Sequence, residues 1–207
     1  EFWLSREAIE SDPVVLQGMK DIGTYTQVTT SHEDIGSMYN YKVAPFANVK
    51  VRGVLWYQGE SNMEYGRVAI YGEQLELLKK SWGKLFGFEN DSMPFIFAQL
   101  TPYDYPGGDT DQLLMTPMMD EMLGFFMDHQ ETCAMVPTYD LSLRYTDNTM
   151  DIHAVIHPTV KMPVGERMCA AALGLVYDKT PATAPVVTGC TFDATGVTVR
   201  FNHVGNG

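Results

Sequence analysis

Apolar residues fall into short runs and longer periodic segments, and the two kinds alternate along the middle of the chain. The short runs are rich in β-branched and aromatic residues, which is typical of strands. The longer segments carry apolar residues at helical spacing or are rich in Met and Ala. The predicted strands are residues 54–57, 94–100 and 133–139, and the predicted helices are residues 66–86, 113–129 and 164–177. This alternation predicts a parallel sheet with helices on its faces.

Some of these elements carry finer signals. The run at 94–100 is almost continuously apolar, which is typical of a strand buried on both faces. Pro117 is expected to limit the start of the Met-rich helix, because proline disrupts a helix interior. Ser5 precedes Arg6-Glu7-Ala8 and is predicted to cap a helix that begins at residue 6.

The two ends of the chain indicate a fragment. The sequence begins inside an apolar stretch without an initiator Met, and it closes with two short predicted strands around a turn at 193–196. An isolated hairpin is marginally stable in water, so we expect this one to belong to a β domain that continues past Gly207. The predicted domains are therefore residues 1–180, an α/β domain, and residues 181–207, the beginning of a β-sandwich-like domain.

Charge and composition exclude several classes of function. The chain has 14 Lys and Arg against 26 Asp and Glu, which gives a formal net charge of −12. Such a surface repels phosphate backbones and anionic lipids, so we expect neither nucleic-acid nor membrane binding. Three widely spaced cysteines form neither a disulfide framework nor a CxxC metal pattern. Cys133 and Cys169 lie in apolar segments and are expected to be buried free thiols.

Polar segments follow each of the three predicted strands. In a parallel α/β sheet the ligand crevice lies at the carboxyl ends of the strands. Those ends lead into residues 58–62, 101–111 and 140–157. The sequence therefore predicts a functional site where these three segments converge.

The first polar segment, Gln-Gly-Glu-Ser-Asn at 58–62, offers small and hydrogen-bonding groups. Gly59 allows close approach of the backbone to a ligand, and Gln58 and Asn62 are neutral donors suited to an oxyanion. Taken alone, Ser61 is a candidate nucleophile. A polar loop that merely caps the following helix is the structural alternative.

A second cluster joins Asp151, His153 and His157 just before the last predicted helix. A histidine paired with a carboxylate is the usual general base of acyl transfer. Two histidines four residues apart could also bind a metal on a helix. However, Pro158 disfavours helix at His157, and the spacing shows no further ligand, so metal binding is the weaker alternative.

Four segments carry a family resemblance. They are FWLSREA at 2–8, the stretch from Met38 that ends in VRGVLWYQGESN at 51–62, MPFIFAQL at 93–100, and IHP with the following Lys161 and VGER at 156–167. Together they resemble the sialate O-acetylesterase family of the SGNH hydrolases, in the expected order over most of residues 1–178. The resemblance implies a flavodoxin-like three-layer α/β fold and serine esterase chemistry on O-acetylated sugars, without a cofactor.

In that family the nucleophilic serine lies in a Gly-x-Ser-Asn block well before WYQGESN. Nothing upstream of Gln58 has that form. The resemblance therefore implies that Ser61 is not the nucleophile and that the true nucleophile lies before Glu1. We expect the fragment alone to be inactive.

The resemblance also assigns roles. Gln58, with Gly59 and Asn62, would stabilise the oxyanion; Glu60 would fix the loop, and Glu60 and Tyr57 would face the substrate. His157 would be the general base, with Asp151 as its partner. The superfamily usually places the acid three residues before this His, where Ala154 stands, so Asp140 remains the second choice of partner and His153 the second choice of base. Met118-Met119-Asp120-Glu121 departs from the Arg-containing segment expected there, which removes one expected substrate contact.

Three hypotheses about function follow. The leading one is a carboxylic ester hydrolase that removes O-acetyl groups from sialic acid or related sugars. The alternatives are a non-catalytic carbohydrate-binding relative and a metal-dependent hydrolase built on Asp151, His153 and His157. The family's glycan substrates suggest a secreted, periplasmic or lysosomal setting. The sequence indicates no oligomeric state.

Overall fold

A computed structural model describes residues 3–25, 35–63, 66–101, 110–141, 161–179, 185–202 and 204, without the side chains of 110–113. Its α-helices are α1 (Arg6–Ser11), α2 (Pro13–Asp21), α3 (Tyr71–Leu85), α4 (Thr110–Asp128) and α5 (Met162–Tyr177). Its strands are β1 (Val54–Trp56), β2 (Phe95–Ala98), β3 (Cys133–Val136), β4 (Val186–Asp193) and β5 (Gly196–Asn202). Short helical turns are η1 (Tyr39–Val43, a π-helix), η2 (Ala44–Phe46), η3 (Glu60–Met63), η4 (Arg67–Ile70) and η5 (Tyr139–Leu141). No helix in the described part of the chain combines the length and the hydropathy needed to cross a membrane.

Strands β1, β2 and β3 form a parallel sheet in that order, as the alternation of elements predicts. Leu55 pairs with Ile96, and Ile96 pairs with Ala134, so these residues share one face of the sheet. All four residues of β2 are buried, which confirms the prediction from its continuous apolar run.

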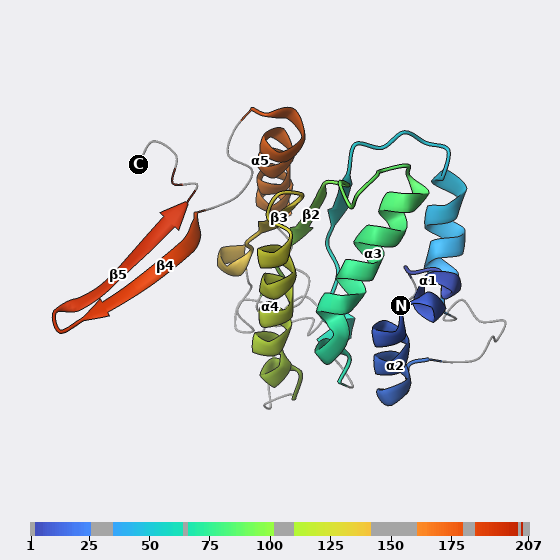
Figure 1. The fold of residues 1–207 in the computed structure, drawn as a ribbon, viewed down its shortest axis with the longest axis horizontal. Helices are drawn as coiled ribbons and strands as arrows, with labels where there is room; N and C mark the ends of the chain where they lie inside the picture. The colour runs from blue at the N-terminus through green and yellow to red at the C-terminus, as the bar shows by residue number, and fades with distance from the viewer. Residues whose placement is uncertain are drawn as a thin grey trace, which may run out of the picture.

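Helices cover the two faces of the sheet and make three layers (Figure 1). Phe95, Phe97 and Cys133 belong to the core shared with α1–α4. The alternate strand residues, Ile96, Ala98, Ala134 and Val136, pack against Val164, Met168 and Ala171 of α5. The predicted α/β architecture is therefore observed, and alternate side chains of each strand serve opposite layers.

The α5 layer does not extend over β1. Leu55 lies on the same face as Ile96, yet Leu55 is 60% exposed whereas Ile96 is 2% exposed. Among the described residues, β1 pairs only with β2, so its other edge is open. Strand β1 thus has an unpaired edge and an apolar residue that α5 does not cover, so a further strand could pair with it there.

Local signals in the sequence explain most helix boundaries. Ser5 caps α1, and its hydroxyl accepts a hydrogen bond from the Ala8 N–H at 3.0 Å, as predicted. Asp12 caps α2 in the same way through the N–H groups of Val14 and Val15. The helix predicted at 66–86 is divided, because a 3₁₀ turn at η4 precedes the regular α3.

The prediction about Pro117 is wrong, because α4 begins at Thr110 and continues through the proline. Met118, Met119 and Met122 follow the proline and are almost completely buried. Burial of this apolar turn outweighs the one backbone hydrogen bond that proline removes.

Two further expectations concern the hairpin and the cysteines. Strands β4 and β5 form the predicted antiparallel hairpin, which projects from the α/β layers (Figure 1). The Asp193 carboxylate accepts hydrogen bonds from the N–H groups of Thr195 and Gly196 and so holds the turn. Cys133 is buried as expected, but Cys169 is exposed because it lies on the side of α5 that faces away from the sheet.

Candidate active site

Residues that follow the three parallel strands meet at the carboxyl edge of the sheet. Gln58 follows β1, Gln99 and Thr101 follow β2, and Thr138 follows β3. Gln99, Thr101 and Thr138 are buried, whereas Gln58 is half-buried. Gln58 and Thr101, from the first two predicted polar segments, thus lie at this edge as expected, whereas the structure describes only Asp140 and Leu141 of the third segment, 140–157.

Gln58 lies in a loop that is fixed by hydrogen bonds. Its side-chain Nε2 donates to Asn62 Oδ1 at 2.8 Å, and Asn62 Nδ2 donates to Gln74 Oε1 at 3.2 Å. The Asn62 backbone N–H also donates to the Gly59 carbonyl at 2.8 Å. One amide hydrogen of Gln58 is thus engaged in the loop, and the amide group carries a second one.

Gly59 has a conformation and surroundings that exclude larger residues. Its φ is +151°, and a Cβ there would lie 3.0 Å from both the Tyr71 hydroxyl and Leu100 Cδ1. The glycine therefore lets the loop turn closely over α3 and the end of β2.

A second set of hydrogen bonds crosses the three strand ends. Thr138 donates to the Gln99 carbonyl at 2.5 Å, and Thr101 donates to Thr138 at 3.1 Å. Since the hydroxyl proton of Thr101 is used on Thr138, the Tyr57 hydroxyl is the donor in its 3.3 Å contact with Thr101. Lys161 Nζ in turn donates to the Tyr57 hydroxyl at 3.3 Å and lies 4.6 Å from the centre of its ring.

Lys161 links this edge to the start of α5. It is the residue immediately before α5, and its side chain is exposed. The contact with Tyr57 places the start of α5 beside the loop that carries Gln58. The predicted residues Asp151, His153 and His157 lie outside the described residues.

Asp140, the second choice of partner for the histidine, is bound to another residue. Arg167 donates to both of its carboxylate oxygens, at 2.7 and 2.5 Å, and also to the Pro137 carbonyl at 2.8 Å. The Arg167 guanidinium holds the pKa of the Asp140 carboxyl below its usual value. Asp140 thus fixes α5 to the end of β3, which is a sufficient structural reason for an acid at this position.

The remaining predicted residues of the loop have simpler surroundings. Glu60 is half-buried at the start of η3, and no described residue donates a hydrogen bond to its carboxylate. Ser61 is exposed, and its hydroxyl has no hydrogen-bond partner among the described residues. Cys133 is no alternative nucleophile, because burial raises the pKa of its thiol to about 12.

Sequence reasoning placed Thr101 in a polar segment at the site but missed three other buried polar residues there: Tyr71, Gln74 and Thr138. Gln74 does carry a signal. It precedes Leu75 on the apolar face of α3, where a buried polar side chain needs a partner. Thr138 carries no comparable signal, because threonine is common near strand ends.

A possible metal-ligand group lies at the opposite, amino edge of the sheet. Glu76, Asp91 and His129 each offer one ligand atom, and these three atoms lie within 4.8 Å of one another. Lys80 already pairs with Glu76 at 2.6 Å, and Lys79 pairs with Asp91 at 2.7 Å. Because these ammonium groups balance the carboxylates, the group has little attraction left for a divalent cation.

Comparison with known proteins identifies a family. A family model described as carbohydrate esterase, sialic acid-specific acetylesterase, matches residues 20–173. Sialate O-acetylesterases of Mus musculus and Rattus norvegicus are each 34% identical over 71 residues, or 32% of this chain. These matches span 13% of the length of the curated relatives.

A solved structure supports the fold. A carbohydrate acetylesterase from Xanthomonas citri superposes with a TM-score of 0.71 over 99% of this chain and 40% of its own, at 22% identity. That likeness shows the same fold, and the family model covers most of the chain, including β1–β3 and the Gln58 loop. The chain belongs to the carbohydrate esterase family of sialic acid-specific acetylesterases.

Proposed function

We propose that the chain is part of a carboxylic ester hydrolase that removes O-acetyl groups from sialic acid or a related sugar through an acyl-enzyme intermediate. The supporting observation is the neutral amide of Gln58, held at the carboxyl edge of the sheet by Asn62. An ester carbonyl becomes an oxyanion in the tetrahedral intermediate, and a fixed neutral donor stabilises that charge without repelling it. Gly59 and Asn62 hold the donor in place.

The open edge of β1 suggests where the nucleophile belongs. In our proposal a further parallel strand pairs with β1, and its connection covers Leu55 beside α5. The carboxyl end of such a strand would adjoin Gln58, because parallel strands end at the same edge. A serine there would attack the carbonyl whose oxygen faces Gln58. We therefore place the nucleophile on a segment outside residues 1–207.

His157 is the proposed general base, with Asp151 as its partner and His153 and Asp140 as second choices. His157 precedes Lys161 by four residues, and a segment of that length spans at most about 14 Å. The contact of Lys161 with Tyr57, beside Gln58, supports this proposal, because Lys161 is so near to His157 in the sequence. The histidine would take the serine proton and return it to the sugar hydroxyl that leaves.

Tyr57 and Glu60 are the proposed contacts to the sugar, since they flank Gln58 and are half-buried. Glycan substrates of this kind fit a secreted, periplasmic or lysosomal enzyme.

The hairpin β4–β5, with exposed apolar residues such as Val199 and Phe201, would be the beginning of a β domain.

Two measurements on the full-length protein test the proposal. The protein should release acetate from O-acetylated sialic acid, and a fluorophosphonate should label one serine outside residues 1–207 and stop the reaction. Labelling of Ser61, or acetate release by residues 1–207 alone that Ser61→Ala abolishes, would contradict the placement of the nucleophile. Binding of the sugar without labelling or acetate release would instead support a non-catalytic carbohydrate-binding relative.

A further inference from the structure

The first turns of α3 carry two buried polar side chains that both act on Gln58. Tyr71 and Gln74 are three residues apart and therefore lie on the same side of the helix. Tyr71 is 2% exposed and Gln74 is 5% exposed. Such polar groups are costly to bury unless they have partners, and the Gln58 loop supplies those partners.

Tyr71 fixes the backbone of Gln58. Its hydroxyl donates to the Gln58 carbonyl at 2.6 Å and accepts a hydrogen bond from Trp56 Nε1 at 3.4 Å. The same hydroxyl lies against Gly59, where a Cβ would approach it to 3.0 Å. The backbone at the end of β1 is thus held from the helix side.

Gln74 fixes the side chain of Gln58 through Asn62. Its Oε1 accepts from Asn62 Nδ2, which directs Asn62 Oδ1 toward Gln58. Because Asn62 Oδ1 can only accept, it orients the Gln58 amide with its nitrogen toward Asn62. The orientation of the donor therefore depends on an acceptor at Gln74, two hydrogen bonds away.

We infer that Tyr71 and Gln74 are positioning residues for the oxyanion donor: Tyr71 sets the backbone of Gln58, and Gln74 sets the rotation of its amide through Asn62. This inference rests on the proposed role of Gln58. A donor must be aimed at the developing charge before the reaction, because a misplacement of about 1 Å can cost roughly 10²-fold in rate. Neither residue needs to touch the substrate for its loss to lower turnover.

The inference predicts different results for two isosteric variants of Gln74 in the full-length enzyme. Gln74→Met removes the acceptor and should lower kcat by about 10- to 100-fold with KM nearly unchanged. Gln74→Glu keeps an acceptor for Asn62 Nδ2 and should lose less kcat than Gln74→Met, although its buried carboxylate also disfavours the oxyanion. Gln17→Met, the same change at an exposed position of α2, is the control and should leave kcat unchanged.

A double-mutant cycle separates positioning from general stability. On a Gln58→Ala background, Gln74→Met should cause little further loss of kcat, because the group that it positions is already absent. Independent losses that multiply would contradict the inference. Should Gln74→Met fail to fold, Tyr71→Phe serves in the same cycle, since it removes only the hydroxyl that holds the Gln58 carbonyl.

The outcomes also distinguish this inference from the proposed function. If Gln58→Ala keeps normal turnover per folded molecule, the proposed role of Gln58 fails. If Gln58→Ala loses turnover but Gln74→Met and Tyr71→Phe do not, the oxyanion role stands and the positioning inference is wrong.

Discussion

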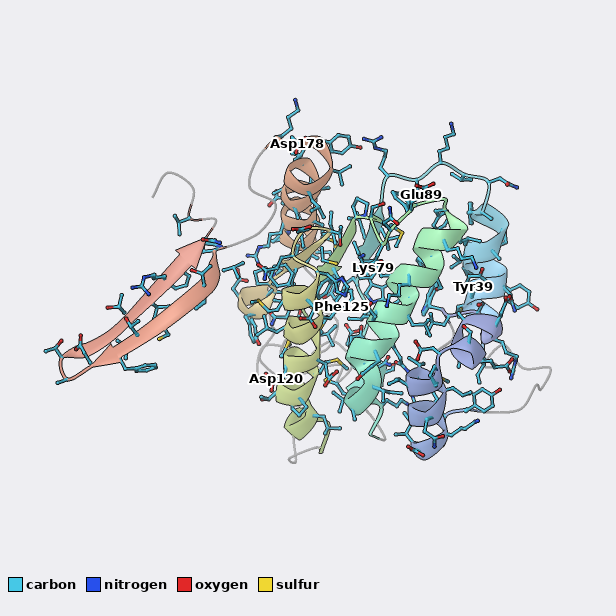
Figure 2. All side chains as sticks on the ribbon, viewed as in Figure 1. Tyr39, Lys79, Glu89, Asp120, Phe125 and Asp178 are labelled. Carbon is cyan, nitrogen blue, oxygen red and sulfur yellow. The ribbon has the colours of Figure 1, made fainter. Side chains whose placement is uncertain are left out.

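The two edges of the sheet are stabilised by different chemistry, although α3 serves both. At the carboxyl edge, Tyr71 and Gln74 from its first turns bind the Gln58 loop through neutral hydroxyl and amide groups. At the amino edge, Glu76, Lys79 and Lys80 form an ionic network with Asp91 and His129. The ring of Phe125, on α4, lies 4.9 Å from the ring of His129 between their centres. Figure 2 labels Phe125 and Lys79, which lies on α3.

The difference follows from what each edge has to do. A buried charge is tolerated where a charge of opposite sign is paired with it permanently, as Asp91 is with Lys79. An oxyanion forms only during the reaction. A carboxylate already present at its site would repel it, and the cation of an ion pair already present there would be neutralised by its own partner. Neutral dipoles that are fixed in advance avoid both problems. The comparison therefore predicts that changes at the carboxyl edge affect turnover, whereas changes at the amino edge affect stability.

The largest expected effect on turnover lies at the carboxyl edge. His157→Ala in the full-length enzyme should lower kcat by about 10²–10⁴-fold, because a general base contributes about that much. His153→Ala should be milder. Steady-state hydrolysis of an O-acetylated sugar measures both variants, and equal losses at the two positions would remove the preference for His157.

The amino edge should show the opposite behaviour. Lys79 is 0% exposed, and its ammonium donates to the Asp91 carbonyl at 2.6 Å as well as pairing with the carboxylate. Lys79→Met leaves these acceptors without their donor and should lower the free energy of unfolding by about 1–3 kcal/mol. Turnover per folded molecule should stay normal. A large loss of kcat in the folded variant would break the division between the two edges.

Acid should weaken the amino edge through Glu76. Burial acts to raise the pKa of its carboxyl, but the hydrogen bond from Lys80 and the nearby His129 outweigh burial, so the folded pKa lies below the ordinary 4.5. A lowered folded pKa means that the stabilisation is present above the ordinary pKa and is lost as the pH falls through the folded one. Urea unfolding at about pH 6 and about pH 3 should show a smaller loss for Glu76→Gln than for the native protein. An equal loss in both proteins would mean that Glu76 does not contribute.

The smallest expected effect is at Asp140. Its side chain is 65% exposed, so solvent screens its ion pair with Arg167 and the pair contributes little to stability. Asp140→Asn should therefore lower the melting temperature slightly and reduce kcat far less than Asp151→Asn does. A larger kcat loss at Asp140 would make it the partner of the histidine.

Much of this molecule could be predicted from sequence because the signals are local. The apolar run at 94–100 marks a fully buried strand, and Ser5 marks the start of α1, since each depends on neighbouring residues. Pro117 was misleading, because burial of the methionines after it is a tertiary effect. The partner of Gln74 could not be predicted for the same reason, since Asn62 and Gln74 are twelve positions apart and only the packing of α3 joins them.

The central claim is that Gln58 is an oxyanion donor and not merely a brace for the loop, and one comparison tests it most directly. The kcat, KM and melting temperature of Gln58→Ala should be measured in the full-length enzyme, with kcat expressed per folded molecule. The account predicts a loss of about 10²–10³-fold in kcat with KM nearly unchanged, and a larger loss for Gln58→Glu, whose carboxylate would repel the oxyanion. Normal turnover per folded molecule together with a lowered melting temperature would contradict it.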